Sequence, residues 1–558
     1  MSPSPRLETE TTPLLLQRTK DVEDAEDPTK MPKARRNMIL VAVWLGVFLG
    51  ALDGTIVATL ISDVSSSFSK SNQAGLLGTS YLLSTATFTP LYGRLADLFG
   101  RRGALLTALT LFTVGTAGCG VAPSMNALLA ARLIAGMGGG GIMACSSIVA
   151  SDLIPLKQRA LFQGLANLWF GAGSGLGGPL GGFISDRWGW RAAFMGQLPI
   201  LALAGLLVFR NLTYRTHGQG KSKREMVRRI DYLGSLTLVL SLGSLLVSLS
   251  IKNDRNQPWS NPLVWGPLIV FAVSTVAFIL IEAYWSAEPV MPLRILKERN
   301  GLFVALISFT VSFVSFSILY FYPQFFQIVQ QKTASQAGAH LLPNSIALSI
   351  GSLFAGWIIR KTGRYWLLTV LTSFCPIVAL SCFVFLTERS GWVHSWLSVL
   401  PSGFGFASVI TSTLIALIAS VDRTEMATAT GLTYLFRYVG QVVGVACSAS
   451  VLQAVLTSEL HKRITGKGAE KVIEKIRHVA TSIPSLPPHQ QQAARDSYNS
   501  ALRAVFLLNL AVAVVCFLSS LPIREYPLHG SFAEEEEARR QRNGEGTPAA
   551  TVEGEEEP

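Results

Sequence analysis

Apolar runs of about 20 residues, separated by short polar segments, recur along most of the chain. An α-helix of that length crosses the roughly 30 Å hydrocarbon core of a bilayer. The runs are too long and too uniformly apolar for the alternating strands of about ten residues that build a membrane barrel. The sequence therefore predicts an all-α polytopic membrane protein. Fourteen transmembrane helices are expected, at roughly 38–60, 74–92, 104–122, 127–150, 161–184, 192–210, 231–251, 264–283, 302–322, 338–359, 366–386, 393–420, 430–456 and 501–522.

Composition narrows the class of protein further. Charged residues make up 15% of the chain and the mean hydropathy is +0.39, whereas ordinary soluble domains are about 25% charged. The net charge of +12 does not indicate nucleic-acid binding, because the basic residues lie in short segments between apolar runs. The six cysteines lie inside apolar runs without CxxC spacing, so neither zinc nor a disulfide framework is indicated. We expect no metal site and no cofactor. P-loop, GxSxG and HExxH patterns are missing, so neither an enzyme nor an ATP-driven pump is expected.

Lys and Arg in the short loops predict the orientation, because they favour the cytosolic side of a membrane. Loops on the side of the two tails hold nineteen Lys or Arg residues, and short loops on the other side hold seven. Both tails are therefore expected in the cytosol, and the long segment 457–500 is expected on the lumenal side. The glycosylation pattern Asn211-Leu-Thr213 falls on the cytosolic side, where we expect it to stay unmodified.

The segment after the second run reads Gly93-Arg-Leu-Ala-Asp97-Leu-Phe-Gly100-Arg101-Arg102. Its glycines allow a tight turn between two helices, and Asp97 can cap a helix or pair with a base on a neighbouring helix. The segment resembles the loop signature of the major facilitator superfamily. This resemblance implies a conformational latch that forms in one state of a transporter and breaks in another. The alternative is a plain cytosolic turn that carries the positive charges of that side.

Further segments match the same superfamily in order along the first half. The fourth run contains Arg132-Leu-Ile-Ala-Gly136. The fifth contains Gly173, Gly178, Pro179 and Gly182, which follow an antiporter-type pattern that is one residue short. The first contains LDGTIV at 52–57. The last segment resembles the 14-span drug:proton antiporter branch. In the second half, 356–364 is a weaker counterpart of the loop signature, with Arg360 in place of the acid.

The resemblance implies two six-helix bundles, spans 1–6 and 9–14, that rock around a substrate site near the midplane, with spans 7 and 8 inserted between them. The expected segments are a disordered cytosolic tail (1–37), the first bundle (38–210), a basic cytosolic loop (211–230), two additional spans (231–283), a cytosolic linker (284–301), the second bundle (302–522) with a lumenal loop (457–500), and an acidic cytosolic tail (523–558).

A closer resemblance is to fungal vacuolar basic amino-acid transporters. It rests on LDGTIVA at 52–58, PLYGRLAD at 90–97, AGMGGGG at 135–141, SDLIPL at 151–156 and GPLGG at 178–182. It implies proton-coupled antiport of Lys, Arg or His from the cytosol into the vacuole. Two alternatives stay open: a plasma-membrane multidrug:proton exporter of the same branch, and a non-transporting nutrient sensor on a transporter scaffold.

Two opposite charges lie deep inside the apolar runs. Asp53 is roughly 22 Å along the first helix, deeper than any other acid in spans 1–6. A carboxylate inside a membrane is costly and is a functional hypothesis by default. Low-dielectric surroundings disfavour its charged form and a nearby cation favours it, so Asp53 can couple protons or bind a cationic substrate. Alternatively, Asp53 is a polar residue at a helix break beside Gly54. Arg132, the base deep in span 4, either exchanges partners with Asp53 or pins the two helices together.

Further pathway candidates are Trp169, Tyr320, Tyr322, Gln324, His340, Asn344 and Arg437. Aromatic residues at the end of a span more often form a belt at the membrane interface. His340 can exchange protons near neutral pH and so sense an acidic lumen, although a lone histidine at a span mouth is more often inert. Arg437 begins a glycine-spaced packing face, and we expect its side chain to snorkel toward the cytosol.

In the N-terminal tail, Glu10-Thr-Thr-Pro-Leu14-Leu15 fits the acidic dileucine pattern that cytosolic sorting adaptors read. A disordered tail can present such a peptide, which favours a vacuolar or lysosome-like membrane as the location. A chance match would leave the plasma membrane open. The expected partners are a small-molecule amino acid, protons, the lipid bilayer and a sorting adaptor, and no nucleic acid.

Overall fold

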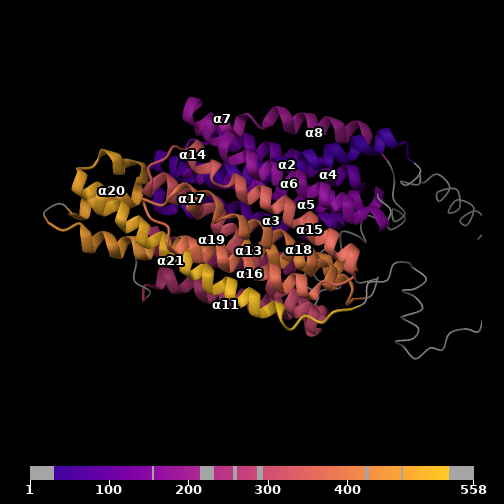
Figure 1. Ribbon diagram of the computed structural model, residues 1–558. Helices are drawn as coiled ribbons and strands as arrows, with labels where there is room; N and C mark the ends of the chain where they lie inside the picture. The colour runs from indigo at the N-terminus through magenta and orange to yellow at the C-terminus, as the bar shows by residue number, and fades with distance from the viewer. Residues whose placement is uncertain are drawn as a thin grey trace, which may run out of the picture.

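The computed structural model describes residues 31–153, 156–213, 231–254, 260–285, 293–421, 426–466 and 469–526. Within these ranges the chain is helical and contains no strand, as the sequence predicts (Figure 1). The helices of the first half are α2 (Lys33–Ser67), α3 (Ala74–Leu98), α4 (Gly100–Val121), α5 (Met125–Leu153), α6 (Leu156–Trp188), α7 (Trp190–Met195) and α8 (Leu198–Asn211), with the short turn η2 (Ser71–Gln73).

The second half begins with α10 (Tyr232–Asp254) and α11 (Pro262–Tyr284). The helices that follow are α12 (Leu293–Lys297), α13 (Arg299–Gln324), α14 (Ala334–Ala339), α15 (Leu342–Thr362), α16 (Trp366–Val384), α17 (Trp392–Leu397), α18 (Leu400–Ile418), α19 (Met426–Arg463), α20 (Ala469–His478) and α21 (Pro488–Ser520). Two irregular turns accompany them, η3 (Phe325–Val329), a π-helix, and η5 (Ala480–Ser485), a 3₁₀-helix.

Twelve helices of the described chain are long and apolar enough to span a membrane. They coincide with twelve of the fourteen predicted runs. The other two runs, 74–92 and 161–184, lie within α3 and α6. The chain is therefore a multi-pass membrane protein, and the count of fourteen spans stays a prediction.

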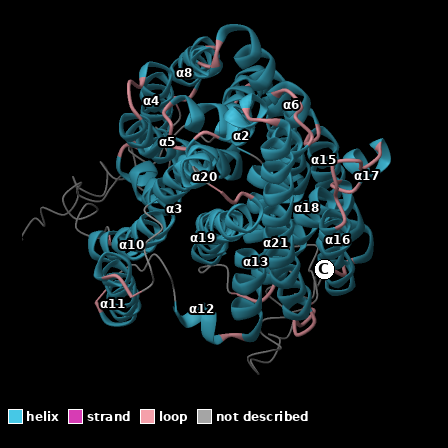
Figure 2. Ribbon diagram, turned by 90° about the vertical axis from the view of Figure 1, so that its left-hand side faces the viewer, coloured by secondary structure: helices cyan, strands magenta, loops and turns pink. Residues whose placement is uncertain are grey.

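The long helices lie alongside one another, so the molecule has two ends (Figure 1). We call the end where α2 begins and α21 finishes the tail end, and the opposite end, which carries α20, the cap end. Helices α2–α8 pack mainly among themselves and form the N-terminal bundle, and α13–α21 form the C-terminal bundle. Figure 2 looks onto the cap end and shows the two groups of helices with α20 near the middle.

Glycines explain how closely α4 and α5 pack. A Cβ atom at Gly138 would lie 2.2 Å from the backbone nitrogen of Phe112, and one at Gly115 would lie 2.2 Å from that of Ala135. No side chain fits at these distances, so the two backbones touch directly. Without a hydrophobic force between helices in lipid, such close contact is the main source of helix association.

Helices α10 and α11 form a hairpin outside the two bundles. The Ser248 hydroxyl donates to the Val264 carbonyl oxygen at 2.8 Å and holds the two helices together. Helix α10 packs against α3 of one bundle and α19 of the other, next to α3 in Figure 2. The outer face of α11 is apolar and open, with Val273 63% exposed, as expected for a surface that meets lipid.

The segment 457–500, expected as a loop, is largely helical. Helix α19 continues to Arg463 and α21 begins at Pro488, so both extend past their apolar runs with polar turns. Between them, α20 buries Ile473 and Ile476 on one face. The backbone N–H of Ala480 donates to the Ser71 hydroxyl at 3.2 Å, so this segment reaches the N-terminal bundle. The described residues 464–466 and 469–487 therefore form a cap over the end of the molecule.

Candidate functional site

The two deep charges predicted from the sequence form an ion pair. Arg132 Nη1 of α5 lies 2.6 Å from Asp53 Oδ2 of α2. Asp53 is 0% exposed and Arg132 is 1% exposed. The pair is therefore buried in the protein interior and does not face lipid.

The spacing Arg132-x-x-x-Gly136 explains how the guanidinium reaches this position. A Cβ atom at Gly136 would lie 2.3 Å from the Tyr81 carbonyl oxygen, so this glycine lets α5 touch α3. The guanidinium then lies 4.4 Å over the Tyr81 ring, a cation–π contact. Its Nε donates to the Leu77 carbonyl oxygen at 3.4 Å. The arginine thus contacts α2 and α3 at once.

The hydrogen bonding of the pair is incomplete. Asp53 Oδ1 and Arg132 Nη2 have no hydrogen-bond partner among the described residues. Burying two charges costs several kcal/mol per ion, and their attraction offsets this only when the remaining polar atoms are satisfied. Because the hydrogen-bond network around the pair is already incomplete, either charge can exchange its partner for a proton or a ligand without breaking a complete network.

The C-terminal bundle reaches this pair through Tyr320 of α13. Tyr320 is 1% exposed, and its ring lies at Gly78, the residue after Leu77, whose carbonyl oxygen accepts a hydrogen bond from Arg132. A Cβ atom at Gly78 of α3 would lie 2.6 Å from the Tyr320 ring, so the missing side chain makes room for it. Tyr320 was predicted as a pathway candidate, but its contact with α3 has no signal in the sequence. The ion pair therefore lies where the two bundles meet.

The predicted turn between spans 2 and 3 is present, but only one of its glycines makes it. Gly100 begins α4 with a φ of +74°, which favours glycine. Gly93 lies within α3, with open space around it, and takes no part in the turn. The side chain of Asp97 lies outside the described residues, so its latch role stays a prediction.

The two arginines of this segment have contacts inside the N-terminal bundle. Arg101 Nε lies 2.8 Å from Asp152 Oδ2 at the end of α5. The Arg102 guanidinium lies 4.2 Å over the Phe209 ring of α8. Asp152 lies in the segment SDLIPL, but its sequence gave no sign of a partner 51 residues away. These contacts hold α4, α5 and α8 together at the tail end.

The glycine pattern in α6 brings the two bundles into backbone contact at the cap end. A Cβ atom at Gly178 would lie 2.7 Å from the Gly338 carbonyl oxygen, and one at Gly182 would lie 2.4 Å from Ser335 Cα. The Ser335 hydroxyl donates to the Pro179 carbonyl oxygen at 3.5 Å. On another face of α6, a Cβ atom at Gly173 would lie 2.2 Å from the Phe48 carbonyl oxygen of α2. Helix α6 is thus packed between α2 and α14.

Two predicted pathway residues are packed inside the C-terminal bundle. The Tyr322 hydroxyl donates to the Ser395 carbonyl oxygen at 2.7 Å, so the side chain forms no interface belt. The His340 ring is 2% exposed and stacks 3.8 Å from the Phe326 ring. Its Nδ1 faces the Gln336 carbonyl oxygen at 2.7 Å.

Lys332 completes the surroundings of His340. His340 Nε2 lies 3.1 Å from Lys332 Nζ. A carbonyl oxygen accepts only and an ammonium donates only, so Nδ1 carries the proton and the imidazole is neutral. Burial lowers the pKa of Lys332, which lies between two spans.

The remaining candidates occupy different places. Gln324 is buried, at 4% exposure. Asn344 of α15 packs closely against α18, because a Cβ atom at Gly403 would lie 2.2 Å from the Asn344 carbonyl oxygen. Trp169 packs edge-on against Phe48 at 6.2 Å. Arg437 is 8% exposed and does not snorkel, because its Nη2 donates to the Ile410 carbonyl oxygen at 3.3 Å.

The predicted sorting residues Glu10, Leu14 and Leu15 lie outside the described residues. Asn211, the predicted unmodified glycosylation position, ends α8, and its carbonyl oxygen accepts a hydrogen bond from Arg35 Nε at 3.2 Å. Within the described chain, no group of three or more His, Cys, Asp or Glu residues could hold a metal ion.

Two bundles of membrane-spanning helices around a buried charge pair are the architecture of a membrane transporter. A model of the Major Facilitator Superfamily matches residues 43–445, and the chain belongs to this family.

Two curated relatives differ in what their names say. The chain is similar to the multidrug resistance protein fnx1 of Schizosaccharomyces pombe, with 37% identity over 88% of this chain and 93% of that protein. It is also similar to the vacuolar basic amino acid transporter 1 of Saccharomyces cerevisiae, with 30% identity over 87% of this chain and 91% of that protein. The chain shares its fold with a solved bacterial homologue of the human lysosomal transporter Spinster, in an inward-facing and occupied conformation. The TM-score is 0.58 at 15% identity, and the match covers 90% of this chain and 100% of that chain.

Proposed function

We propose that the protein is a proton antiporter that moves Lys, Arg and His from the cytosol into the vacuole by alternating access. The buried Asp53–Arg132 pair carries this proposal, because it places an exchangeable carboxylate where the two bundles meet. The similarity to a vacuolar basic amino acid transporter supports the substrate class and the location. In the proposed orientation, with both tails in the cytosol, the tail end is cytosolic and the cap end is lumenal.

Asp53 would couple protons to the change of conformation. When the carboxylate is charged, it holds Arg132 at 2.6 Å and can also attract a cationic substrate. When a lumenal proton neutralises it, the attraction to both cations is lost and the substrate is released. The proton then leaves on the cytosolic side as Asp53 pairs again with Arg132. Coupling arises because protonation changes the relative free energy of the two conformations.

Arg437 would bind the carboxylate that every amino acid carries. Its side chain is buried, and its guanidinium lies 5.1 Å over the Tyr434 ring. Its Nε has no hydrogen-bond partner, and no acidic side chain of the described residues pairs with it. A buried cation without an opposite charge is costly, and a substrate carboxylate would compensate it. This feature favours an amino acid over a drug that is only cationic.

Isolated vacuoles test the function directly. Vacuoles that contain the protein are expected to take up labelled Lys, Arg or His when ATP drives their proton pump, well above vacuoles without it. An uncoupler that collapses the proton gradient is expected to abolish the difference. Uptake that survives the uncoupler would contradict proton coupling. Absence of any uptake would favour the nutrient-sensor alternative.

A plasma-membrane multidrug:proton exporter is the second candidate, favoured by the similarity to fnx1. Deleting residues 10–15, which hold Glu10, Leu14 and Leu15, is expected to move a fluorescently tagged protein from the vacuole to the plasma membrane, because adaptors read this peptide. Fluorescence microscopy measures the change. Replacing Thr11 and Thr12 by Ala, which leaves the pattern intact, is the matched control. Plasma-membrane fluorescence before any deletion, with drug sensitivity in the null strain, would favour the exporter.

A further inference from the structure

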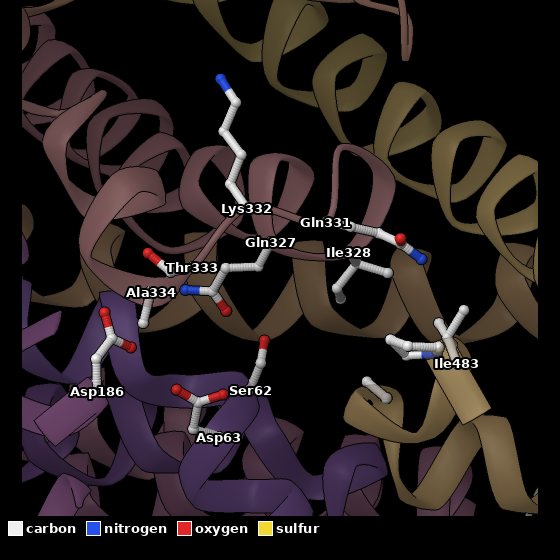
Figure 3. A pocket seen from close by; sticks show the side chains of 12 residues that line it. Ser62, Asp63, Asp186, Gln327, Ile328, Gln331, Lys332, Thr333, Ala334 and Ile483 are labelled. Atoms are coloured by element: carbon white, nitrogen blue, oxygen red, sulfur yellow. The ribbon is translucent and has the colours of Figure 1, made fainter. Parts of the chain in front are cut away.

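A cavity of about 300 Å³ lies at the cap end between the two bundles and the cap (Figure 3). Ser62 and Asp63 of α2 and Asp186 of α6 line it from the N-terminal bundle. Gln327 and Ile328 of η3 line it from the C-terminal bundle, and Ile483 of η5 lines it from the cap. The cavity is therefore lined by three parts of the chain that are far apart in sequence.

The wall formed by the N-terminal bundle carries hydrogen-bond acceptors that have no partner among the described residues. Figure 3 shows Asp63, Asp186 and Ser62 projecting from their helices into the space. No cation of the described residues forms an ion pair with either carboxylate. Ser62 is 5% exposed, and its hydroxyl makes no hydrogen bond within the described chain. An unpartnered hydroxyl of a buried residue, facing the cavity beside two carboxylates, indicates that a ligand completes the site.

The opposite wall adds one acceptor and an apolar surface. Gln327 Nε2 donates to the Thr59 carbonyl oxygen, which fixes the amide, and Gln327 Oε1 is left buried without a partner. It belongs to a π-helix, a distortion that is frequent at functional sites. Ile328 and Ile483 supply the apolar part of the wall.

Lys332, the cation nearest this cavity among its lining residues, does not fill it. Its side chain points away from the two carboxylates (Figure 3), and its Nζ lies 3.1 Å from His340 Nε2. The net character of the cavity is therefore acidic at one wall and apolar at the other.

We infer that this cavity binds an organic cation in which an aliphatic chain ends in a primary ammonium or a guanidinium group. The carboxylates of Asp63 and Asp186, with the Ser62 hydroxyl and Gln327 Oε1, accept hydrogen bonds from the cationic head. Ile328 and Ile483 pack against the methylene chain. A bare metal ion would use the oxygens but would leave the apolar wall and most of the volume unfilled.

The site gives the proposed transport cycle a second station for the substrate. It rests on the proposed function for the identity of the cation, a basic amino acid, and for its lumenal position. Because its walls come from both bundles, the site exists only while the cap end is closed. A bound cation therefore stabilises that closed state, and opening of the cap end releases it into the lumen.

Equilibrium binding to the purified full-length protein tests the inference. Labelled lysine is the probe, and all variants carry Asp53→Asn so that the central carboxylate does not contribute. One binding site per protein is expected with Asp63 and Asp186 intact. The double variant Asp63→Asn/Asp186→Asn is expected to weaken binding at least tenfold. Asp496→Asn, which removes an exposed carboxylate on α21, is the matched control and is expected to bind normally.

The outcomes separate this inference from the proposed function. Lysine binding that is unchanged in the double variant would overturn the inference. Binding of Ca²⁺ at the same carboxylates, with no binding of lysine, would overturn it as well. The milder variant Ser62→Ala, expected to weaken lysine binding measurably, covers the case in which the double variant does not fold. Loss of lysine binding in these variants, with no lysine uptake by vacuoles, would support the site and contradict the transport function.

Discussion

Replacing Asp53 by Asn is expected to reduce proton-driven uptake of basic amino acids to the background of vacuoles that lack the protein. Asparagine keeps the size of the side chain but can neither take up a proton nor balance Arg132, which is 2.6 Å away. Uptake of labelled Lys, Arg and His into isolated vacuoles measures the effect. Asp496→Asn, on the surface of α21, is the control and is expected to leave uptake unchanged.

Stability measurements distinguish coupling from folding at this pair. Asp53→Leu or Arg132→Met alone leaves the opposite charge buried, which is expected to cost roughly 3–5 kcal/mol of unfolding free energy. The double variant Asp53→Leu/Arg132→Met removes both charges and is expected to recover thermal stability in detergent. It is still expected to show no proton-driven uptake.

Transport by that double variant would refute the role of Asp53 in coupling. The pair would then be a structural contact that pins α2 to α5. Normal uptake by Asp53→Asn at normal protein level would lead to the same conclusion.

Replacing Gly182 by Val is expected to prevent closure of the cap end and to abolish transport. A Cβ atom at this position would lie 2.4 Å from the Cα and backbone nitrogen of Ser335. Backbone atoms cannot rotate out of the way, so α6 and α14 must separate. Each bundle keeps its own packing, and the protein is therefore expected to fold.

Labelling of a single cysteine measures the separation. Ser345 of α15 is 3% exposed, and its hydroxyl donates to the Ser174 hydroxyl of α6 at 3.5 Å. Because this contact covers it, Ser345→Cys in a cysteine-free protein is expected to react slowly with a soluble maleimide. Gly182→Val is expected to raise the rate severalfold. Gly205→Val on α8, where a Cβ atom meets open space, is the matched control. Slow labelling and normal uptake in Gly182→Val would show that α6 and α14 need not touch.

The sequence indicates the helices and the central pair because their signals are local or strongly constrained. Apolar runs of membrane length predict helices in most contexts. Asp53 and Arg132 are opposite charges at similar depth in apolar helices, and each is costly alone. Their pairing at 2.6 Å is therefore the arrangement that the physics of burial favours.

Contacts between distant segments are harder to predict. Gly178 and Gly182 indicate close packing. Their partners Gly338 and Ser335 lie more than 150 residues away, and no sequence pattern marks them as the residues that pack there. Tyr320 beside Gly78 is a similar case. These contacts depend on how the two bundles meet, which local periodicity does not encode.

Two side chains depart from the usual preferences of their residue type. Arg437 lies in α19 near the tail end, where snorkelling is usual, yet it is held inside by the Ile410 carbonyl oxygen. His340 lies near a span mouth, but the rings of Phe326 and Trp396 enclose it. In both cases neighbours from other helices decide the position.

The hydrogen bond from Ala480 to Ser71 joins the cap to the opposite bundle. Any motion that parts the bundles at this end must break it, so the surface around α20 differs between the two states. An antibody fragment raised against that surface would discriminate between them, and would serve as a probe of which state prevails in living cells.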